Sequence, residues 1–168
     1  MYHVHRRWAR HLGYLRTCLT NSMSIVVTYN KLVEFGDCDP ARIVWFPNYF
    51  KWIDAASRNY FTQRGVPPWH ATEREFGILG TPVVDTHAQF TNTASYGDVL
   101  SIHTRITQWR KTSFVMHYEV MRDHCSIMTC IETRVFAKHV GNTPDSSHHQ
   151  IKAIPVPEFI KQLCGFSQ

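Results

Sequence analysis

Residues 34–60 read EFGDCDPARIVWFPNYFKWIDAASRNY, an acidic turn followed by an aromatic segment with helical spacing. Pro47 suits the first position of a helix, where its missing N–H would have no partner in any case. Beyond it, apolar side chains recur at the spacing of one helix face, at Tyr49, Trp52, Ile53, Ala56 and Tyr60. The pattern predicts a helix of about four to five turns that ends at the breaker residues 65–68.

The segments that flank this helix have the composition of β-strands. Residues 24–35 are rich in β-branched and aromatic side chains with rough alternation, and predict a first strand. Four more runs of this kind follow the helix, at residues 81–91, 99–109, 113–122 and 126–139. Their short, turn-like connections predict a meander of antiparallel hairpins.

The remaining segments are shorter. Residues 69–80 predict a loop or a short helical turn, residues 140–150 a polar loop, and residues 157–163 a terminal helix. Together these segments predict an α+β fold, in which a five-stranded antiparallel sheet wraps around one long central helix.

Composition and charge favour one globular domain. The chain has 168 residues, 43% of them hydrophobic, and a net charge of +5. Four of these charges come from arginines in residues 1–22, which contain no acid, so residues 23–168 carry 14 basic and 13 acidic side chains. That near-neutral body argues against nucleic acid binding. No apolar run approaches the ~20 residues of a membrane span, so no membrane partner is expected.

Residues 1–22 form an N-terminal extension with three open interpretations. The segment is Arg-rich and acid-free, as an amphipathic address segment would be. It also fits a disordered tail, or a start codon placed too early, with Met23 as the true first residue. We expect residues 23–168 to be the functional domain.

The five cysteines are odd in number and irregularly spaced, which matches neither a disulfide framework nor a zinc site. The histidines form no HxxxH pattern, and His148 and His149 fall in the predicted polar loop. We therefore expect a reducing, cytoplasmic setting and no bound metal.

The acidic turn contains the first candidate for chemistry. Asp39 precedes Pro40 and is therefore biased towards an extended conformation. Asp37 and Asp39 are one residue apart and should point to opposite sides, so that one can face a cleft while the other caps a turn. An ordinary Asx-turn remains the alternative for Asp39. Because the next helix starts nearby, its unpaired N–H groups could polarise a carbonyl oxygen, which suits acyl-group hydrolysis.

Carboxylates on both sides disfavour a thiolate at Cys38, which we take as structural.

Two further polar clusters are candidates for ligand binding. Asp54 lies one turn before Arg58, so a surface ion pair between them competes with a place in a ligand pocket near the apolar face. The tip Arg110-Lys111-Thr112-Ser113 combines two cations with two hydroxyl groups. Such tips are usually only solvated, but the combination also suits a ligand that carries phosphate.

With these residues laid out, the chain resembles the hotdog-fold acyl-CoA thioesterases, and among them the Asp-dependent 4-hydroxybenzoyl-CoA thioesterases. The resemblance covers residues 32–160. Its most specific stretches are EFGDCDPA (34–41), IVW (43–45), PNY (47–49), DAASRNYF (54–61), PPW (67–69), GTPVV (80–84), TASY (93–96) and RVFA (134–137).

The resemblance implies a hotdog fold and hydrolysis of an aromatic acyl-CoA to the free acid and coenzyme A, with no cofactor. It makes Asp39 the catalytic carboxylate, acting as nucleophile or general base. It makes Phe46 the residue whose backbone N–H binds the thioester oxygen. It also implies assembly as a dimer of dimers, with the sites at subunit interfaces.

The same resemblance assigns the substrate-binding residues. Asp54, from the neighbouring subunit, would receive the 4-hydroxyl of the acyl group. Apart from the resemblance, the aromatic Trp45 is a candidate for the surface against which the ring would lie. Arg110, Lys111 and Ser113 match the region that binds the phosphates of coenzyme A.

Three positions depart from the family pattern. Arg42 stands where the family has glycine, which requires a backbone conformation that arginine can adopt. Phe46 replaces a tyrosine, so the backbone donor survives without the hydroxyl. Thr112 replaces a third basic residue near the phosphates.

Three hypotheses follow. The first is an aromatic acyl-CoA thioesterase that prefers 4-hydroxybenzoyl-CoA, because a buried Asp54 would go unpaired with an analogue that lacks the hydroxyl. The second is a broad thioesterase for short or medium aliphatic acyl-CoA substrates, which have no use for Asp54. The third is a non-catalytic acyl-CoA-binding or protein-binding module, which Arg42 would favour if it pinned the Asp39 carboxylate.

Overall fold

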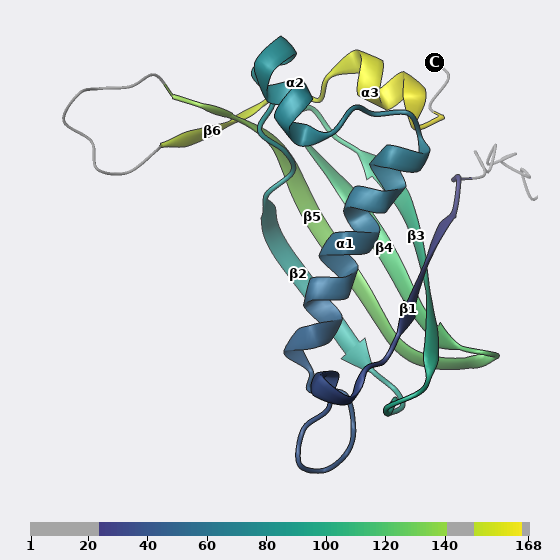
Figure 1. The fold of residues 1–168 in the computed structure, drawn as a ribbon. Helices are drawn as coiled ribbons and strands as arrows, with labels where there is room; N and C mark the ends of the chain where they lie inside the picture. The colour runs from purple at the N-terminus through teal and green to yellow at the C-terminus, as the bar shows by residue number, and fades with distance from the viewer. Residues whose placement is uncertain (1–23, 141–149, 166–168) are drawn as a thin grey trace, which may run out of the picture.

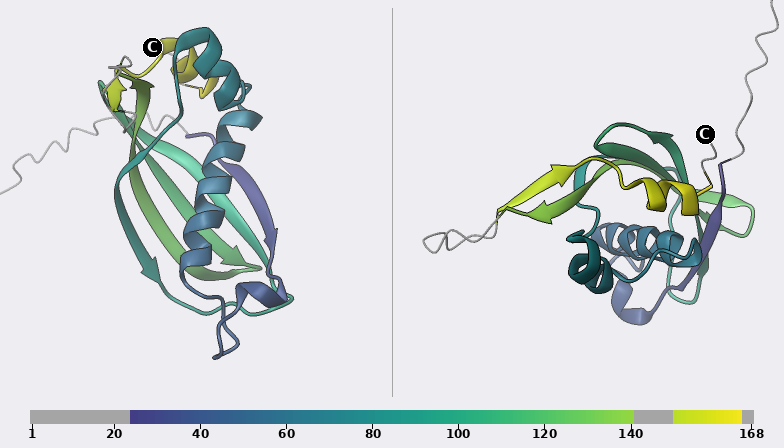
Figure 2. Two further views of the ribbon diagram at one scale, coloured as in Figure 1. Left: turned by 60° about the vertical axis from the view of Figure 1, so that its left-hand side comes forward. Right: turned by 90° about the horizontal axis from the view of Figure 1, so that it is seen from above.

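The computed structural model describes residues 24–140 and 150–165. One long helix, α1 (Pro47–Gln63), lies across the concave face of an antiparallel sheet (Figures 1 and 2). Pro47 occupies the first turn of α1, as predicted. The helix buries one broad face against the sheet, formed by Asn48, Tyr49, Trp52, Ile53, Ala56, Ser57, Tyr60 and Phe61.

The sheet has six strands, in the order β1-β3-β4-β5-β2, with β6 paired to β5. They are β1 (Val27–Leu32), β2 (Val83–Phe90), β3 (Val99–Trp109), β4 (Ser113–Arg122), β5 (Cys125–His139) and β6 (Ile151–Ile154). Along β3 and β4, alternate residues are buried beneath α1. The alternation of buried and less buried residues therefore marks the side of the sheet that faces the helix.

The predicted meander is correct for β3, β4 and β5, but wrong for β2. β2 pairs with β5 at the far edge of the sheet, and β3 pairs with β1 instead. The connection 91–98 therefore leads from β2 past two intervening strands, β5 and β4, to β3. Its eight residues can span about 26 Å, whereas three strand spacings cover only about 14 Å. A connection of this length does not require a hairpin.

Strand β6 was not predicted, so the sheet has six strands and not five. It has only four residues, Ile151–Ile154, and pairs with the end of β5. Most of its side chains are exposed, which leaves little hydrophobic pattern for prediction.

Three short helices complete the described part of the chain. They are η1 (Phe35–Asp37), α2 (Trp69–Phe76) and α3 (Glu158–Leu163). The short helical turn expected in residues 69–80 and the terminal helix expected in 157–163 are both present. α3 lies at the C-terminal end of α1, where Arg64 Nε donates a hydrogen bond to the Leu163 carbonyl at 3.0 Å.

The N-terminal extension 1–22 and most of the expected polar loop, including His148 and His149, lie outside the described residues. Among residues 24–140 and 150–165, no helix has the length and apolar composition needed to cross a bilayer.

Candidate active site

The turn that carries Asp39 is closed by backbone hydrogen bonds just before α1. Cys38 and Val44 form an isolated antiparallel bridge, and Asp39 N donates to the Ile43 carbonyl at 2.9 Å. Within the turn, Arg42 N donates to the Asp39 carbonyl at 2.8 Å. These bonds hold Asp39 beside the segment that leads into the helix.

The Asp39 side chain is fixed at one oxygen and available at the other. Its Oδ1 accepts the Ala41 N–H at 2.8 Å, which is the Asx-turn expected as the alternative. Its Oδ2 has no hydrogen-bond partner among the described residues. Asp39 also lines a pocket of about 700 Å³ with Cys38 and the exposed rings of Phe35 and Tyr96, whose centroids are 6.1 Å apart. Asp39 therefore forms an Asx-turn and also lines a pocket, so the two interpretations do not exclude each other.

Asp37 has the structural role that the sequence allowed for one of the two acids. Its Oδ2 accepts the Glu34 N–H at 2.9 Å at the start of η1 and pairs with Lys31 Nζ at 3.3 Å. Its carbonyl accepts hydrogen bonds from Trp45 N and Asn48 Nδ2, both at 2.9 Å. Asp37 thus ties the acidic turn to the first turn of α1.

Arg42 adopts the left-handed backbone conformation that the family glycine would adopt easily, with φ of 65°. Its side chain is exposed and lines the Asp39 pocket. Within the described residues, no ion pair joins Arg42 to Asp39. The pinned carboxylate of the third hypothesis is therefore not present in this chain.

Phe46 and Trp45 stand at the start of α1 but not in the Asp39 pocket. Phe46 is the N-cap residue, and its N–H has no partner within the described part of the chain. Its side chain lines a separate pocket of about 190 Å³ with Tyr49 and Phe90. Trp45 is about half exposed and lines neither the Asp39 pocket nor the Asp54 pocket.

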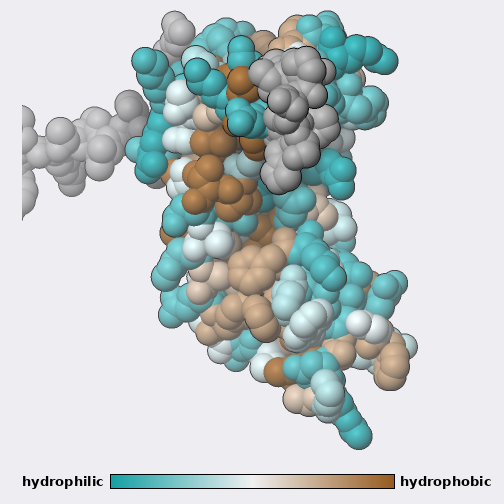
Figure 3. All heavy atoms as spheres, turned by 90° about the vertical axis from the view of Figure 1, so that its left-hand side faces the viewer, coloured by the Kyte–Doolittle hydropathy of each residue, from teal (hydrophilic) through white to brown (hydrophobic). Residues whose placement is uncertain are grey.

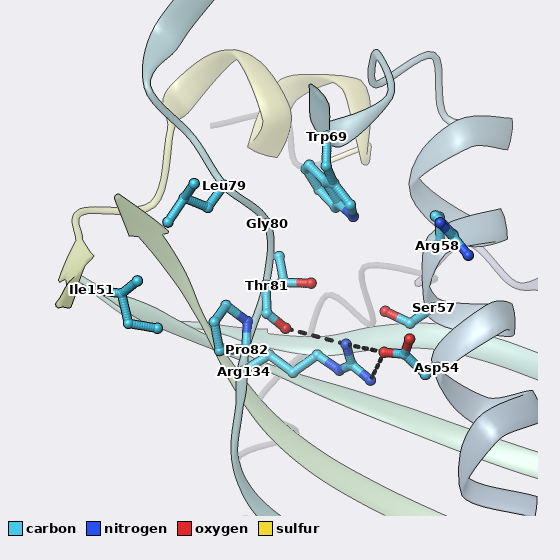
Figure 4. Close-up of a pocket in the computed structure, with 10 residues that line it drawn as sticks. All are labelled: Asp54, Ser57, Arg58, Trp69, Leu79, Gly80, Thr81, Pro82, Arg134 and Ile151. Atoms are coloured by element: carbon cyan, nitrogen blue, oxygen red, sulfur yellow. Dashed lines mark hydrogen bonds and ion pairs between the residues drawn. The ribbon is translucent and has the colours of Figure 1, made fainter. Parts of the chain in front are cut away.

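Asp54 lines a different pocket, of about 330 Å³, between α1, the segment before β2 and the start of β6 (Figure 4). The Trp69 indole forms one wall and Ser57 lies beside the carboxylate. Asp54 lies seven residues after Pro47, about 10 Å along the helix axis. No residue lines both the Asp39 pocket and the Asp54 pocket.

The partner of Asp54 is Arg134 and not Arg58. Arg134 Nη1 and Nη2 both donate to Asp54 Oδ1 at 3.1 Å (Figure 4). Arg58 lines the same pocket, but the described residues include no ion pair between it and Asp54. Asp54 therefore lines a pocket, and the i, i+4 ion pair with Arg58 is not formed, while a role of Asp54 in ligand binding stays a prediction.

The cationic tip lies at the connection between β3 and β4. Arg110 N donates to the Ser113 carbonyl at 2.8 Å, and the Arg110 guanidinium contacts Gln108 Oε1 at 3.0 Å. The Lys111 carbonyl accepts the Val156 N–H at 2.9 Å, which holds the tip near α3. Both cationic side chains are exposed.

A single chain does not bring the three predicted clusters together. The Asp39 turn lies beside the start of β3, because Val33 N donates to the Asp98 carbonyl at 2.8 Å just before η1. Arg110 and Lys111 follow the last residue of β3. This strand has 11 residues, so the two clusters lie roughly 35 Å apart along the sheet.

Several residues of the two pockets were not singled out from the sequence. They are Phe35 and Tyr96 beside Asp39, and Ser57, Trp69 and Arg134 beside Asp54. Phe35 and Ser57 lie within a few residues of Asp39 and Asp54, whereas Tyr96, Trp69 and Arg134 are distant in sequence from the carboxylate that they accompany. The signal was nevertheless present, because all five occur within the quoted stretches EFGDCDPA, DAASRNYF, PPW, TASY and RVFA.

Comparison with known families and proteins agrees with this fold. Residues 33–163 match the thioesterase-like superfamily, and the chain belongs to that family. It is 48% identical over 148 residues to a 4-hydroxybenzoyl-CoA thioesterase from Pseudomonas sp. (strain CBS-3), covering 85% of this chain and all of that relative.

Solved structures give the same result. A mutant of 4-hydroxybenzoyl-CoA thioesterase complexed with 4-hydroxybenzoyl-CoA superimposes with a TM-score of 0.76 at 46% identity, covering 83% of this chain and 98% of that one. A gentisyl-coenzyme A thioesterase gives a TM-score of 0.68 at 28% identity, covering 80% and 99%. The expected hotdog fold and thioesterase family are both confirmed.

Proposed function

We propose that this protein hydrolyses the thioester of 4-hydroxybenzoyl-CoA, or of a related hydroxyaromatic acyl-CoA, to the free acid and coenzyme A. The observation that carries the proposal is the Asp39 carboxylate, which is anchored at Oδ1, has a free Oδ2 and lines a pocket beside the start of α1. The 48% identity to a 4-hydroxybenzoyl-CoA thioesterase supports the same substrate class.

Asp39 acts on the carbonyl carbon of the thioester. As a general base, its Oδ2 takes a proton from water while the water oxygen attacks that carbon. As a nucleophile, Oδ2 attacks directly and forms an anhydride, which water then hydrolyses. In both routes the C–S bond breaks, and the thiolate of coenzyme A leaves and takes up a proton.

The N–H of Phe46 is the donor for the oxygen that becomes negative during attack. It is unpartnered among the described residues and lies at the positive end of the α1 dipole. A thioester needs less activation than an amide, so one carboxylate and one such donor can suffice without a triad. Cys38 shares the pocket with Asp39 but has no step in this scheme.

Asp54 supplies the contact to the para hydroxyl of the acyl ring. Its pocket combines the Trp69 indole with a carboxylate whose Oδ2 has no partner within the described chain (Figure 4). In an assembly that buries this carboxylate, an aliphatic acyl chain would leave the acceptor unpaired, which disfavours the broad thioesterase. Trp45 is about half exposed and lines neither pocket of the single chain, and we propose that it contacts the ring in the assembled enzyme.

The complete site requires more than one copy of the chain. Asp39 and Asp54 line separate pockets, and the cations that would bind the coenzyme A phosphates, Arg110 and Lys111, lie at the far end of β3. We therefore propose a homo-oligomer, a dimer of dimers, in which Asp39 of one copy faces Asp54 of another and Ser113 assists the phosphate contacts.

Strand β2 is the element that we propose for the contact between copies. It is an edge strand, and seven of its eight residues are exposed. Apolar side chains gather on the side of the molecule that bears β2 (Figure 3), and Val83, Val84 and Phe90 of this strand are exposed. An uncovered apolar edge of this kind is suited to pairing with a second sheet.

We also propose that the reaction takes place in the cytoplasm. The four described cysteines, Cys38, Cys125, Cys130 and Cys164, are all free thiols. A reducing compartment keeps such thiols unpaired.

The first test compares thiol release from 4-hydroxybenzoyl-CoA, benzoyl-CoA and hexanoyl-CoA as kcat/KM. The proposal expects a strong preference for the 4-hydroxy compound. Equal or faster release from hexanoyl-CoA would establish the broad thioesterase, and no release from any of the three would leave the binding module.

The second test replaces Asp39 by Asn. The variant should lose about 10²–10⁴-fold in turnover, as usual for removal of an acid–base group, while its unfolding transition is unchanged. Near-normal turnover in a folded D39N protein would exclude the mechanism.

A further inference from the structure

A chain of buried polar side chains stands behind Asp54. Arg134 and Glu132, neighbouring inward-facing residues of β5, are only 3% and 4% exposed. Arg134 Nε donates to Glu132 Oε2 at 2.8 Å, and the fully buried Tyr118 hydroxyl donates to the same oxygen at 2.8 Å. The row therefore runs from Tyr118 through Glu132 and Arg134 to Asp54.

The row is rigid at its inner end. Burial raises the pKa of Tyr118 well above its usual value, so the phenol stays protonated and donates to Glu132. Arg134 is fixed a second time, because its Nη1 donates to the Thr81 carbonyl at 3.2 Å. A planar guanidinium held at Nε and Nη1 has little freedom left, so the direction of its remaining donor is set.

At the outer end of the row, Arg134 contacts only one oxygen of Asp54. Both Nη atoms of Arg134 contact Oδ1, whereas Oδ2 is turned away from the guanidinium (Figure 4). The Asp54 side chain is 68% exposed and would otherwise be free to rotate. The guanidinium therefore leaves Oδ2 of Asp54 available as an acceptor for a ligand that donates a hydrogen bond.

We infer that Arg134, held by Glu132 and Tyr118, is a positioning residue that fixes Asp54 and thereby makes the pocket select acyl groups with a hydroxyl donor. The inference rests on the proposed function, because it assigns the ring hydroxyl to Asp54. It adds that selectivity depends on a buried residue 80 positions away, which acts through its hydrogen bonds to Asp54.

Binding measurements test this role apart from turnover. The parent is D39N, and the affinities for 4-hydroxybenzoyl-CoA and benzoyl-CoA are measured by calorimetry. The test variant, R134M/E132Q, removes the guanidinium without leaving a buried charge unpaired. We expect the affinity ratio to fall roughly 10-fold or more, which is the size of a hydrogen bond to a charged group, while the affinity for benzoyl-CoA is unchanged.

The matched control is R105M/E119Q. Arg105 and Glu119 form an ion pair of similar length, 2.9 Å, on the opposite face of the sheet and make no contact with Asp54. This variant should keep the parent ratio. If R134M/E132Q also keeps it, or if it weakens both ligands equally, Arg134 has only a structural role and the inference is wrong.

A double-mutant cycle tests whether Arg134 acts through Asp54. In a D54N background, R134M/E132Q should lower the ratio no further, and a further fall would overturn the inference. If R134M/E132Q does not fold, R134K and Y118F replace it. Lysine lacks the planar fork of donors that holds Glu132 and Asp54 in fixed directions, and phenylalanine removes the donor to Glu132, so an unchanged ratio in both variants would also overturn it.

Failure of the inference is separable from failure of the proposed function. A D39N parent that binds the two acyl-CoA compounds equally would overturn the roles of Asp54 and Arg134. Thiol release from 4-hydroxybenzoyl-CoA by the wild-type enzyme would still establish the reaction.

Discussion

Asp39 and Asp54 each present one carboxylate oxygen to a pocket while the other oxygen is fixed. The anchor of Asp39 is local, the N–H of Ala41 two residues away at 2.8 Å. The anchor of Asp54 is distant, the guanidinium of Arg134 in β5. Local sequence can therefore indicate the state of the first carboxylate but not of the second.

Arg42 offers a stability prediction at the same scale. Its φ of 65° is unfavourable for a residue with a Cβ atom, so R42G should raise the free energy of unfolding by about 1 kcal/mol. Urea denaturation measures the change. The control is D123G, at φ of 53°, which should gain less because aspartate tolerates this region better. Equal gains at both sites, or no gain at Arg42, would contradict the strain argument.

Residues with local signals were predictable, and those defined by tertiary contacts were not. The Asp-Pro turn identified Asp39, and the helical spacing placed Asp54 near the face of α1 that meets the sheet. The i, i+4 rule then suggested Arg58 as the partner of Asp54, because that rule considers only one helix. Arg134 reaches Asp54 through the pairing of β5 beneath α1, which no local pattern contains.

Strands likewise divide into those with a local sequence signal and those placed by tertiary contacts. The bounds of β3 and β4 were predicted correctly, since alternate burial against α1 imposes a clear period of two. The place of β2 was not, because its residues are exposed on both faces and connection 91–98 is long enough to reach either neighbour. Strand β2, which was predicted but misplaced, is the one that we assign to contact between copies.

That assignment predicts the effect of a charge on β2. Val84 is 59% exposed and lies at a register irregularity between Val83 and Asp85, so V84K should leave the β2–β5 pairing intact. A lysine on the edge should weaken association between copies and lower turnover together with it. Sedimentation velocity measures the assembly, and thiol release measures the turnover.

The control for this prediction is V99K. Val99 is similarly exposed, at 55%, but lies at the start of β3 beside β1, away from β2. It should sediment as the wild type does. Dissociation by V99K but not by V84K would move the proposed interface to the other side of the sheet.

At the scale of the whole molecule, hydrogen-bonded polar side chains lie on both faces of the sheet. The inner side contains the row Tyr118, Glu132 and Arg134, and the outer side contains Arg105, His117 and Glu119. The hydrogen bond from Arg105 lowers the pKa of Glu119. The stability from this pair is therefore present above the ordinary pKa of 4.5 and is lost as the pH falls through the lower folded value.

His117 makes stability depend on pH in a higher range. Burial, and then the charge of Arg105, lower the pKa of His117 below its ordinary 6.5, although Glu119 acts in the opposite direction. Between the folded and unfolded pKa values the unfolded chain binds more protons, so stability falls as the pH drops below 6.5. H117Q cannot titrate, and its unfolding free energy should decline less than that of the wild type between about pH 7 and pH 5. Urea denaturation across this range measures the difference. H124Q, at the exposed β4–β5 turn, should follow the wild type, and a wild-type slope in H117Q would show that another group controls this range.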